Sequence, residues 1–191
     1  MPHRLFVAVR LPDEVSGDLE AFLEPRRDAG TELRWTRPEH WHVTLAFMEA
    51  VSDRAVEPLV ERLTAAAARC PRFPLWLGGA GAFPHPYDAR VLWLGVRGPE
   101  QDESPALARL ARSARAAANA AGAAPHGAAF RAHVSLARSR RPVEATRWLR
   151  TLGTYVSAGF VVDRIELVAS HLGEGPRRTP RHETLDTFAL S

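Results

Sequence analysis

The pattern of apolar and polar positions alternates along the chain between a two-residue period and a three- to four-residue period. The first period is typical of strands with one buried face, and the second is typical of amphipathic helices. Helical spacing predicts helices at about residues 13–27, 53–70, 102–121 and 142–152. Alternation and β-branched content predict strands at about 5–10, 33–35, 42–48, 73–83, 90–96, 130–138, 156–172 (with a break near Asp163) and 183–190. A loop is predicted over 173–181.

With the short strand 33–35 counted together with the strand that follows it, the order of these elements is β-α-β-α-β-β-α-β-α-β-β, which favours antiparallel sheets. Many of the strands are short and are joined by hairpins, which leaves the helices to cover the outside of the sheets. No low-complexity linker divides the 191-residue chain. The pattern therefore predicts an α+β fold in a single domain over residues 1–191.

One short motif occurs twice, on two of the predicted strands. The chain reads His-Val-Thr-Leu from His42 and His-Val-Ser-Leu from His133. Side chains at positions i and i+2 of a strand point to the same face. His42 therefore shares a face with Thr44, and His133 shares a face with Ser135. The repetition suggests two related lobes, and two such strands facing one cleft would bring two imidazoles and two hydroxyls together.

Two imidazoles and two hydroxyls suit the cleavage of a phosphodiester without a metal. A histidine, with a pKa near 6.5, serves as an acid or a base near neutral pH, for a gain of about 10²–10⁴ in rate. A neutral histidine would take a proton from water while a protonated one gives a proton to the leaving oxygen. Thr44 and Ser135 would donate hydrogen bonds to the non-bridging oxygens, where negative charge accumulates.

Composition narrows the class of protein and of partner. All 25 basic residues are arginine, and the net charge of +3 mildly favours an anionic partner such as nucleic acid. The single cysteine, Cys70, excludes an intrachain disulfide and makes a cytoplasmic location the default expectation. No apolar run reaches the roughly 18 residues of a membrane helix, so no membrane partner is expected. The tryptophans, Trp93 among them, are expected in the core, although one exposed near the cleft could stack a base.

Several segments, taken in order along the chain, make it resemble a known family. Besides the two histidine motifs, the segments are RLFVAVRLP at 4–12, RW at 34–35, PE at 38–39, GAFP at 81–84 and RVLW at 90–93. Together they are similar to the two-histidine phosphoesterase superfamily, and within it to the RNA 2′,3′-cyclic phosphodiesterases once called 2′–5′ RNA ligases. The resemblance extends over essentially the whole chain.

The resemblance implies a bilobal fold with two pseudo-symmetric lobes, each with an antiparallel sheet flanked by helices, and an active-site cleft between them. It implies hydrolysis of RNA 2′,3′-cyclic phosphate ends to 2′-phosphate without a metal or other cofactor, and we expect the protein to act as a monomer. His42 would be the general acid and His133 the general base, with Thr44 and Ser135 gripping the phosphate. Arg131, two residues before His133, is a candidate phosphate contact on the same strand face.

The chain also departs from this family, and alternatives follow. Ser135 replaces the commoner threonine, His40 stands where asparagine is frequent, and His182 stands where tyrosine is common. His40 and His42 on one strand face would share a Zn²⁺ if a third ligand joined them. The substrate could instead be another cyclic phosphate, of ADP-ribose or a small nucleotide. A module that binds RNA ends with little turnover is the remaining alternative.

Overall fold

A curled antiparallel sheet forms the centre of the computed structural model, which describes residues 2–30, 32–99, 104–175 and 179–191. Its strands are β1 (His3–Arg10), β2 (Arg34–Trp35), β3 (His42–Val51), β4 (Phe73–Phe83), β5 (Ala89–Arg97), β6 (His133–Val143), β7 (Phe160–Val162), β8 (Arg164–His171) and β9 (Arg181–Ala189). Among the described residues the strand order is β7-β4-β5-β6-β3-β1-β8-β9, and β2 pairs with β6. The α+β class and the antiparallel pairing predicted from the sequence are confirmed.

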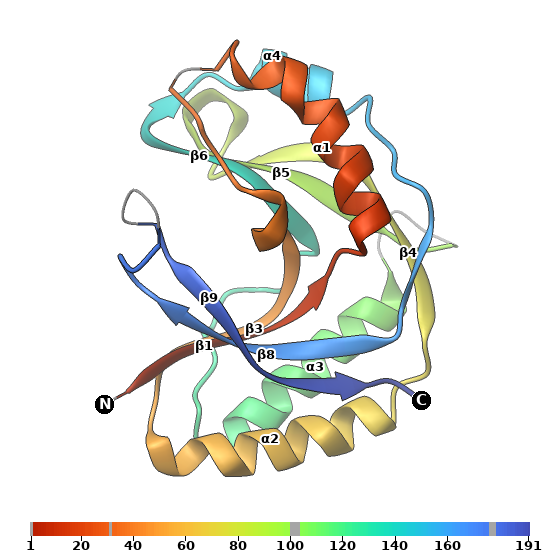
Figure 1. Ribbon diagram of the computed structural model, residues 1–191, viewed down its shortest axis with the longest axis vertical. Helices are drawn as coiled ribbons and strands as arrows, with labels where there is room; N and C mark the ends of the chain where they lie inside the picture. The colour runs from red at the N-terminus through yellow and green to blue at the C-terminus, as the bar shows by residue number, and fades with distance from the viewer. Residues whose placement is uncertain (1, 31, 100–103, 176–178) are drawn as a thin grey trace.

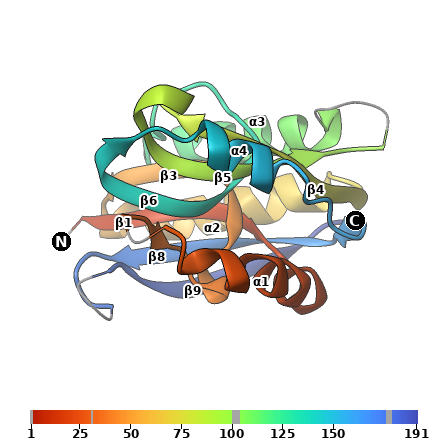
Figure 2. The ribbon, with the colours of Figure 1, turned by 90° about the horizontal axis from the view of Figure 1, so that it is seen from above.

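Helices cover the sheet in two groups. The helices are α1 (Asp13–Arg27), α2 (Asp53–Ala68), α3 (Pro105–Ala120) and α4 (Thr146–Leu152), with short 3-10 turns η1 (Pro38–His40) and η2 (Pro86–Asp88). Helices α2 and α3 pack on each other and against β9, β8 and β3, whereas α4 packs against β4 (Figure 1). The Tyr155 hydroxyl, just after α4, donates a 2.8 Å hydrogen bond to Asp18 of α1. Strands β1 and β9 are both antiparallel to β8 and run in the same direction, so the two chain ends lie on opposite sides of the molecule (Figure 2).

The sheet consists of two halves that meet at the histidine strands. One half is β3-β1-β8-β9 and the other is β6-β5-β4-β7. A single residue pair, Val43 with Val134, joins β3 to β6. These valines occupy the same position in the two motifs, so a local two-fold axis passes between them. The two halves therefore belong to one continuous sheet rather than to two separate sheets.

The same irregularity follows each motif. The register between β1 and β3 shifts where Ala8 pairs with Thr44 and Val7 with Ala46. The register between β5 and β6 shifts where Trp93 pairs with Ser135 and Leu92 with Ala137. At this shift each histidine strand has one extra residue, a leucine, immediately after its hydroxyl residue. This shared bulge supports the relation between the two halves.

Some boundaries differ from those that the pattern predicts. Strand β6 begins at His133 rather than at 130 and continues to Val143, because Val143 pairs with Ala89. The last helix consequently begins at Thr146 instead of 142. The predicted start of the third helix at 102, and residues 176–178 of the predicted loop, lie outside the described residues. The break near Asp163 is confirmed, because the chain forms β7 before it and β8 after it.

Within the described ranges, no helix combines the length and apolarity that crossing a bilayer requires.

Candidate active site

The four residues of the two motifs lie on one face of the sheet, where its halves meet. Val43 and Val134 face each other in an antiparallel pair, and both are fully buried in the core. Their chain neighbours point to the opposite face, which places His42 beside Ser135 and Thr44 beside His133. All four side chains are partly exposed. Diagonal neighbours in such a ladder have Cα atoms about 7–8 Å apart, so both imidazoles are within reach of one small group.

Both imidazoles are held in the same way. His42 Nδ1 donates to the backbone carbonyl of His40 at 2.6 Å, and His133 Nδ1 donates to that of Arg131 at 2.7 Å. A carbonyl only accepts, so Nδ1 carries the hydrogen and Nε2 of each neutral ring keeps a free lone pair. Each histidine is therefore oriented with Nε2 available to take up a proton or, once protonated, to donate one.

Aromatic rings flank each imidazole. Phe6 of β1 stacks on His42 with ring centroids 4.7 Å apart and an interplanar angle of 23°. Phe83 lies edge-on to His133 at 5.1 Å, and Trp93 lies 5.9 Å from the same ring. The expectation that Trp93 lies in the core is wrong. Its side chain is partly exposed beside the site, because its register partner on β6 is the site residue Ser135.

A third histidine from the far end of the chain adjoins the first motif. His182 of β9 lies 4.7 Å from His40 and 5.8 Å from His42, between ring centroids. The Nδ1 atoms of His182 and His40 are buried and, in the described part of the chain, have no hydrogen-bond partner. Arg10 lies nearby, and its Nε donates a 3.0 Å hydrogen bond to Glu166 Oε2. The sequence marked His182 only as a departure from its family, and the structure adds it to the site.

Burial sets the protonation of these imidazoles. Desolvation lowers the pKa of His42 to about 3, although its bond to the His40 carbonyl acts in the opposite direction. Neighbouring His182 and Arg10 lower this pKa further. Desolvation also lowers the pKa of His133, while its bond to the Arg131 carbonyl raises it. Both catalytic candidates are thus neutral in the free protein at neutral pH.

Acidification is expected to destabilise the protein, and His182 is expected to contribute. Burial lowers the pKa of His182 from 6.5 to about 4, helped by the nearby positive charges of His40 and Arg10. Between these two values the unfolded chain binds a proton that the folded chain does not bind. The contribution of His182 to the free energy of unfolding is complete above pH 6.5 and is lost progressively as the pH falls towards 4.

Urea unfolding at pH 7.5 and pH 5.5 measures this effect. His182→Gln should lose less stability between the two pH values than the wild type loses. His85→Gln, in an exposed loop, provides the matched control and should behave as the wild type. An equal loss in His182→Gln and the wild type would contradict the assignment.

The positions of Arg131 and His40 differ from expectation. Arg131 precedes β6 rather than belonging to that strand, and its guanidinium lies 5.1 Å from the centre of the Trp93 ring, which adjoins His133. His40 belongs to η1 rather than to β3. Within the ranges that the structure describes, no group of three or more His, Cys, Asp or Glu residues is placed to hold a metal ion.

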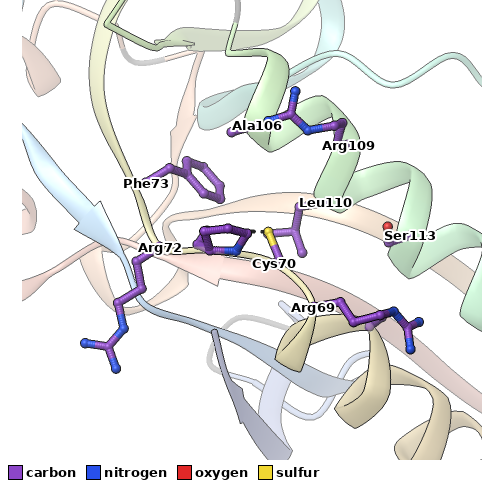
Figure 3. Close-up of a pocket in the computed structure, with 10 residues that line it drawn as sticks. Arg69, Cys70, Arg72, Phe73, Ala106, Arg109, Leu110 and Ser113 are labelled. Atoms are coloured by element: carbon purple, nitrogen blue, oxygen red, sulfur yellow. Dashed lines mark hydrogen bonds between the residues drawn. The ribbon is translucent and has the colours of Figure 1, made fainter. Parts of the chain in front are cut away.

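A hollow of about 340 Å³ lies elsewhere, between the end of α2, the start of β4 and α3 (Figure 3). None of the motif residues lines it. Its three arginines, Arg69, Arg72 and Arg109, point in different directions, so they do not converge on one anion. We assign it no function.

Comparison with known proteins relates the whole chain to one family. The model of the 2′-5′ RNA ligase superfamily matches residues 11–174. An RNA 2′,3′-cyclic phosphodiesterase of Geobacillus stearothermophilus is 31% identical over 193 residues, which cover 97% of this chain and 56% of that protein. One from Aeropyrum pernix is 32% identical over 159 residues, which cover 82% of this chain and 85% of that protein. The chain therefore spans little more than half the length of the first relative and most of the second.

Solved structures agree with the sequence comparison. The protein TT0787 of Thermus thermophilus has a TM-score of 0.79 at 25% identity, with 98% of this chain and 97% of that chain covered. Escherichia coli LigT in apo form has a TM-score of 0.75 at 26% identity, with 100% and 98% covered. Its complex with 3′-AMP has a TM-score of 0.78. With a family model that matches most of its length and relatives above 30% identity, this chain belongs to the 2′-5′ RNA ligase superfamily.

Proposed function

We propose that this chain hydrolyses RNA 2′,3′-cyclic phosphate ends to 2′-phosphates, with His42 and His133 as general acid and base and without a metal. The observation that carries the proposal is the matched pair of imidazoles, each fixed by a backbone carbonyl with Nε2 available, on one face of the sheet. The names of the Geobacillus and Aeropyrum relatives support the same activity. We further propose that the protein acts as a monomer, because one chain supplies both histidines. We propose a cytoplasmic location because the single cysteine, Cys70, excludes an intrachain disulfide.

The reaction then proceeds in one displacement at phosphorus. His133 Nε2 takes a proton from a water molecule as the water oxygen bonds to phosphorus. The bond from phosphorus to the 3′ oxygen breaks, and that oxygen receives the proton of His42 Nε2. The products are a 2′-phosphate and a free 3′-hydroxyl. His133 is left protonated and His42 neutral, and exchange with solvent restores the starting state.

The hydroxyls and the substrate supply the remaining electrostatics. Thr44 and Ser135 lie beside the two imidazoles and donate hydrogen bonds to the non-bridging oxygens. The low pKa of His42 means that this general acid is not protonated in the free protein at neutral pH. A phosphate anion between the imidazoles favours their charged form, so substrate binding raises the pKa of His42 and brings in the proton.

Hydrolysis of a short RNA ending in a 2′,3′-cyclic phosphate, with EDTA present, tests the proposal. The expected product carries its phosphate on the 2′ oxygen alone, which ³¹P NMR identifies. A 3′-phosphate product would contradict the assigned leaving group. If the folded protein hydrolyses a cyclic phosphate of ADP-ribose or of a mononucleotide but not the RNA, that cyclic phosphate replaces RNA as the proposed substrate. Binding of the RNA end without turnover would make the chain an end-binding module instead.

A further inference from the structure

Arginines on the two halves of the sheet have different surroundings. In the half that contains β3, carboxylates pair with Arg10 on β1, Arg164 on β8 and Arg181 on β9, whereas Arg4 on β1 lies over the ring of Phe47. The other half contains a set of arginines that we call the β6 arginine track. These are Arg34 on β2, Arg90 on β5, and Arg138, Arg140 and Arg141 on β6. All five are exposed, and none has a carboxylate partner among the residues described in the structure.

The track begins at the catalytic face. Beyond the bulge at Leu136, Ala137 is fully buried, so the next residue, Arg138, points to the face of His133 and Ser135. The register places Arg34 directly opposite Arg138. Like charges in such a pair destabilise a sheet. Partial desolvation lowers the pKa of Arg138, and the charge of Arg34 lowers it further. Two adjacent guanidinium groups thus lie next to the site without a counter-charge from the described part of the protein.

The track continues away from the site along β6. Arg90 Nη1 donates to the Arg140 carbonyl at 2.8 Å, which holds the Arg90 side chain against this end of β6. Arg140 lies five residues beyond Ser135 on β6, past the bulge at Leu136. Past it stands Tyr87, 80% exposed in η2. The turn is fixed beside β6 because the Pro86 carbonyl accepts a 2.7 Å hydrogen bond from Ala145.

We propose that the β6 arginine track binds the sugar–phosphate backbone of the RNA strand on the 5′ side of the cyclic end. The proposal rests on the function proposed above, and it makes an oligonucleotide, rather than a mononucleotide, the preferred substrate. Guanidinium groups match phosphate oxygens in geometry and charge. A row of them with an exposed aromatic ring at its end suits single-stranded nucleic acid, whose bases stack on such rings. A chain of phosphates whose terminus reaches His133 supplies the counter-charges that the track lacks.

The test compares two substrates in a variant that removes the outer part of the track. Arg90→Gln, Arg140→Gln and Arg141→Gln are combined, and kcat/KM is measured on a ten-nucleotide RNA cyclic phosphate and on cytidine 2′,3′-cyclic monophosphate. The preference for the oligonucleotide should fall about tenfold at low salt. The slope of log kcat/KM against log salt for the oligonucleotide should become shallower by about 2, since each single-strand phosphate contact contributes about 0.7.

A variant with the same change of charge elsewhere provides the control. Arg62→Gln, Arg69→Gln and Arg109→Gln remove three exposed arginines from the side of α2 and α3, and this variant should keep the substrate preference and the salt slope of the wild type. Equal losses of oligonucleotide preference and of salt slope in the two triple variants would overturn the proposed role of the track. Attraction of RNA by net charge alone would then explain the preference. Wild-type hydrolysis of both substrates at equal kcat/KM would also overturn it, while leaving the cyclic phosphodiesterase activity in place. No hydrolysis of either substrate would overturn the proposed function, and fluorescence anisotropy with the same RNA would then decide the track by the same comparison of variants.

Discussion

His42→Ala and His133→Ala should each lower kcat on an RNA 2′,3′-cyclic phosphate by a factor of about 10²–10⁴. In the proposed mechanism, each substitution removes the group that moves one of the two protons in the displacement. KM should change less, because Thr44, Ser135 and the β6 arginine track remain. Initial rates under saturating substrate, with EDTA present, measure the effect.

The double variant and a distant histidine complete this experiment. In the proposed mechanism His42 and His133 act in a single displacement, so His42→Ala combined with His133→Ala should lose little more activity than the more damaged single variant. His126→Ala, at an exposed position outside the site, should keep the wild-type rate. Wild-type rates in both single variants would show that the repeated motif is structural, and the proposed mechanism would be wrong.

Gly81→Ala should destabilise the fold by about 1–3 kcal/mol, because overpacking at this position has no easy relief. A Cβ atom at Gly81 would lie 2.0 Å from a carbon of the Trp93 ring. That ring is itself confined by Phe83, 5.3 Å away, and by His133. Moving Trp93 would disturb the base as well, so kcat should fall together with the free energy of unfolding. Urea unfolding and initial rates on the same preparation measure both effects.

The same substitution in α1 should have the opposite sign. A Cβ atom at Gly17 meets nothing within 4 Å, and the residue lies inside a helix. Gly17→Ala should therefore stabilise the protein by about 0.5–1 kcal/mol. Combining Gly81→Ala with Trp93→Phe should recover part of the lost stability, because the smaller ring relieves the clash. A Gly81→Ala protein as stable as the wild type would contradict the close packing around Trp93.

Local patterns were sufficient to predict the elements and the shared faces of the motif residues. The two-residue period places His42 with Thr44 and His133 with Ser135, and burial of the intervening valines agrees with it. The pairing of Val43 with Val134 could not be predicted in this way, because it joins positions far apart in the sequence. The position of Trp93 beside the site depends on such a long-range register, so local spacing assigned it to the core.

The residues two positions before each histidine illustrate a different limit. Counting along a strand suggests that the Arg131 side chain contacts phosphate and that His40 shares a face with His42. In the structure, the backbone carbonyl of each residue accepts a hydrogen bond that orients the histidine two positions later. Every amino acid has a carbonyl, so a contact of this kind leaves no signature in residue type. Arg138, by contrast, is placed by a bulge that the sequence pattern does not reveal.

Because the two motifs are related by a two-fold axis, they do not by themselves determine which imidazole would act as the acid and which as the base. Under the proposed mechanism, that assignment depends on the residues around the site. Rotation about an axis through the Val43–Val134 pair exchanges the two imidazoles, so the core of the site has no inherent front or back. The equivalence ends five residues after each histidine, where one half has Phe47 and the other Arg138. A substrate that is itself asymmetric contacts different side chains in its two possible orientations, so one orientation is favoured. In the proposed mechanism, the flanking side chains therefore determine which imidazole donates a proton and which one accepts it.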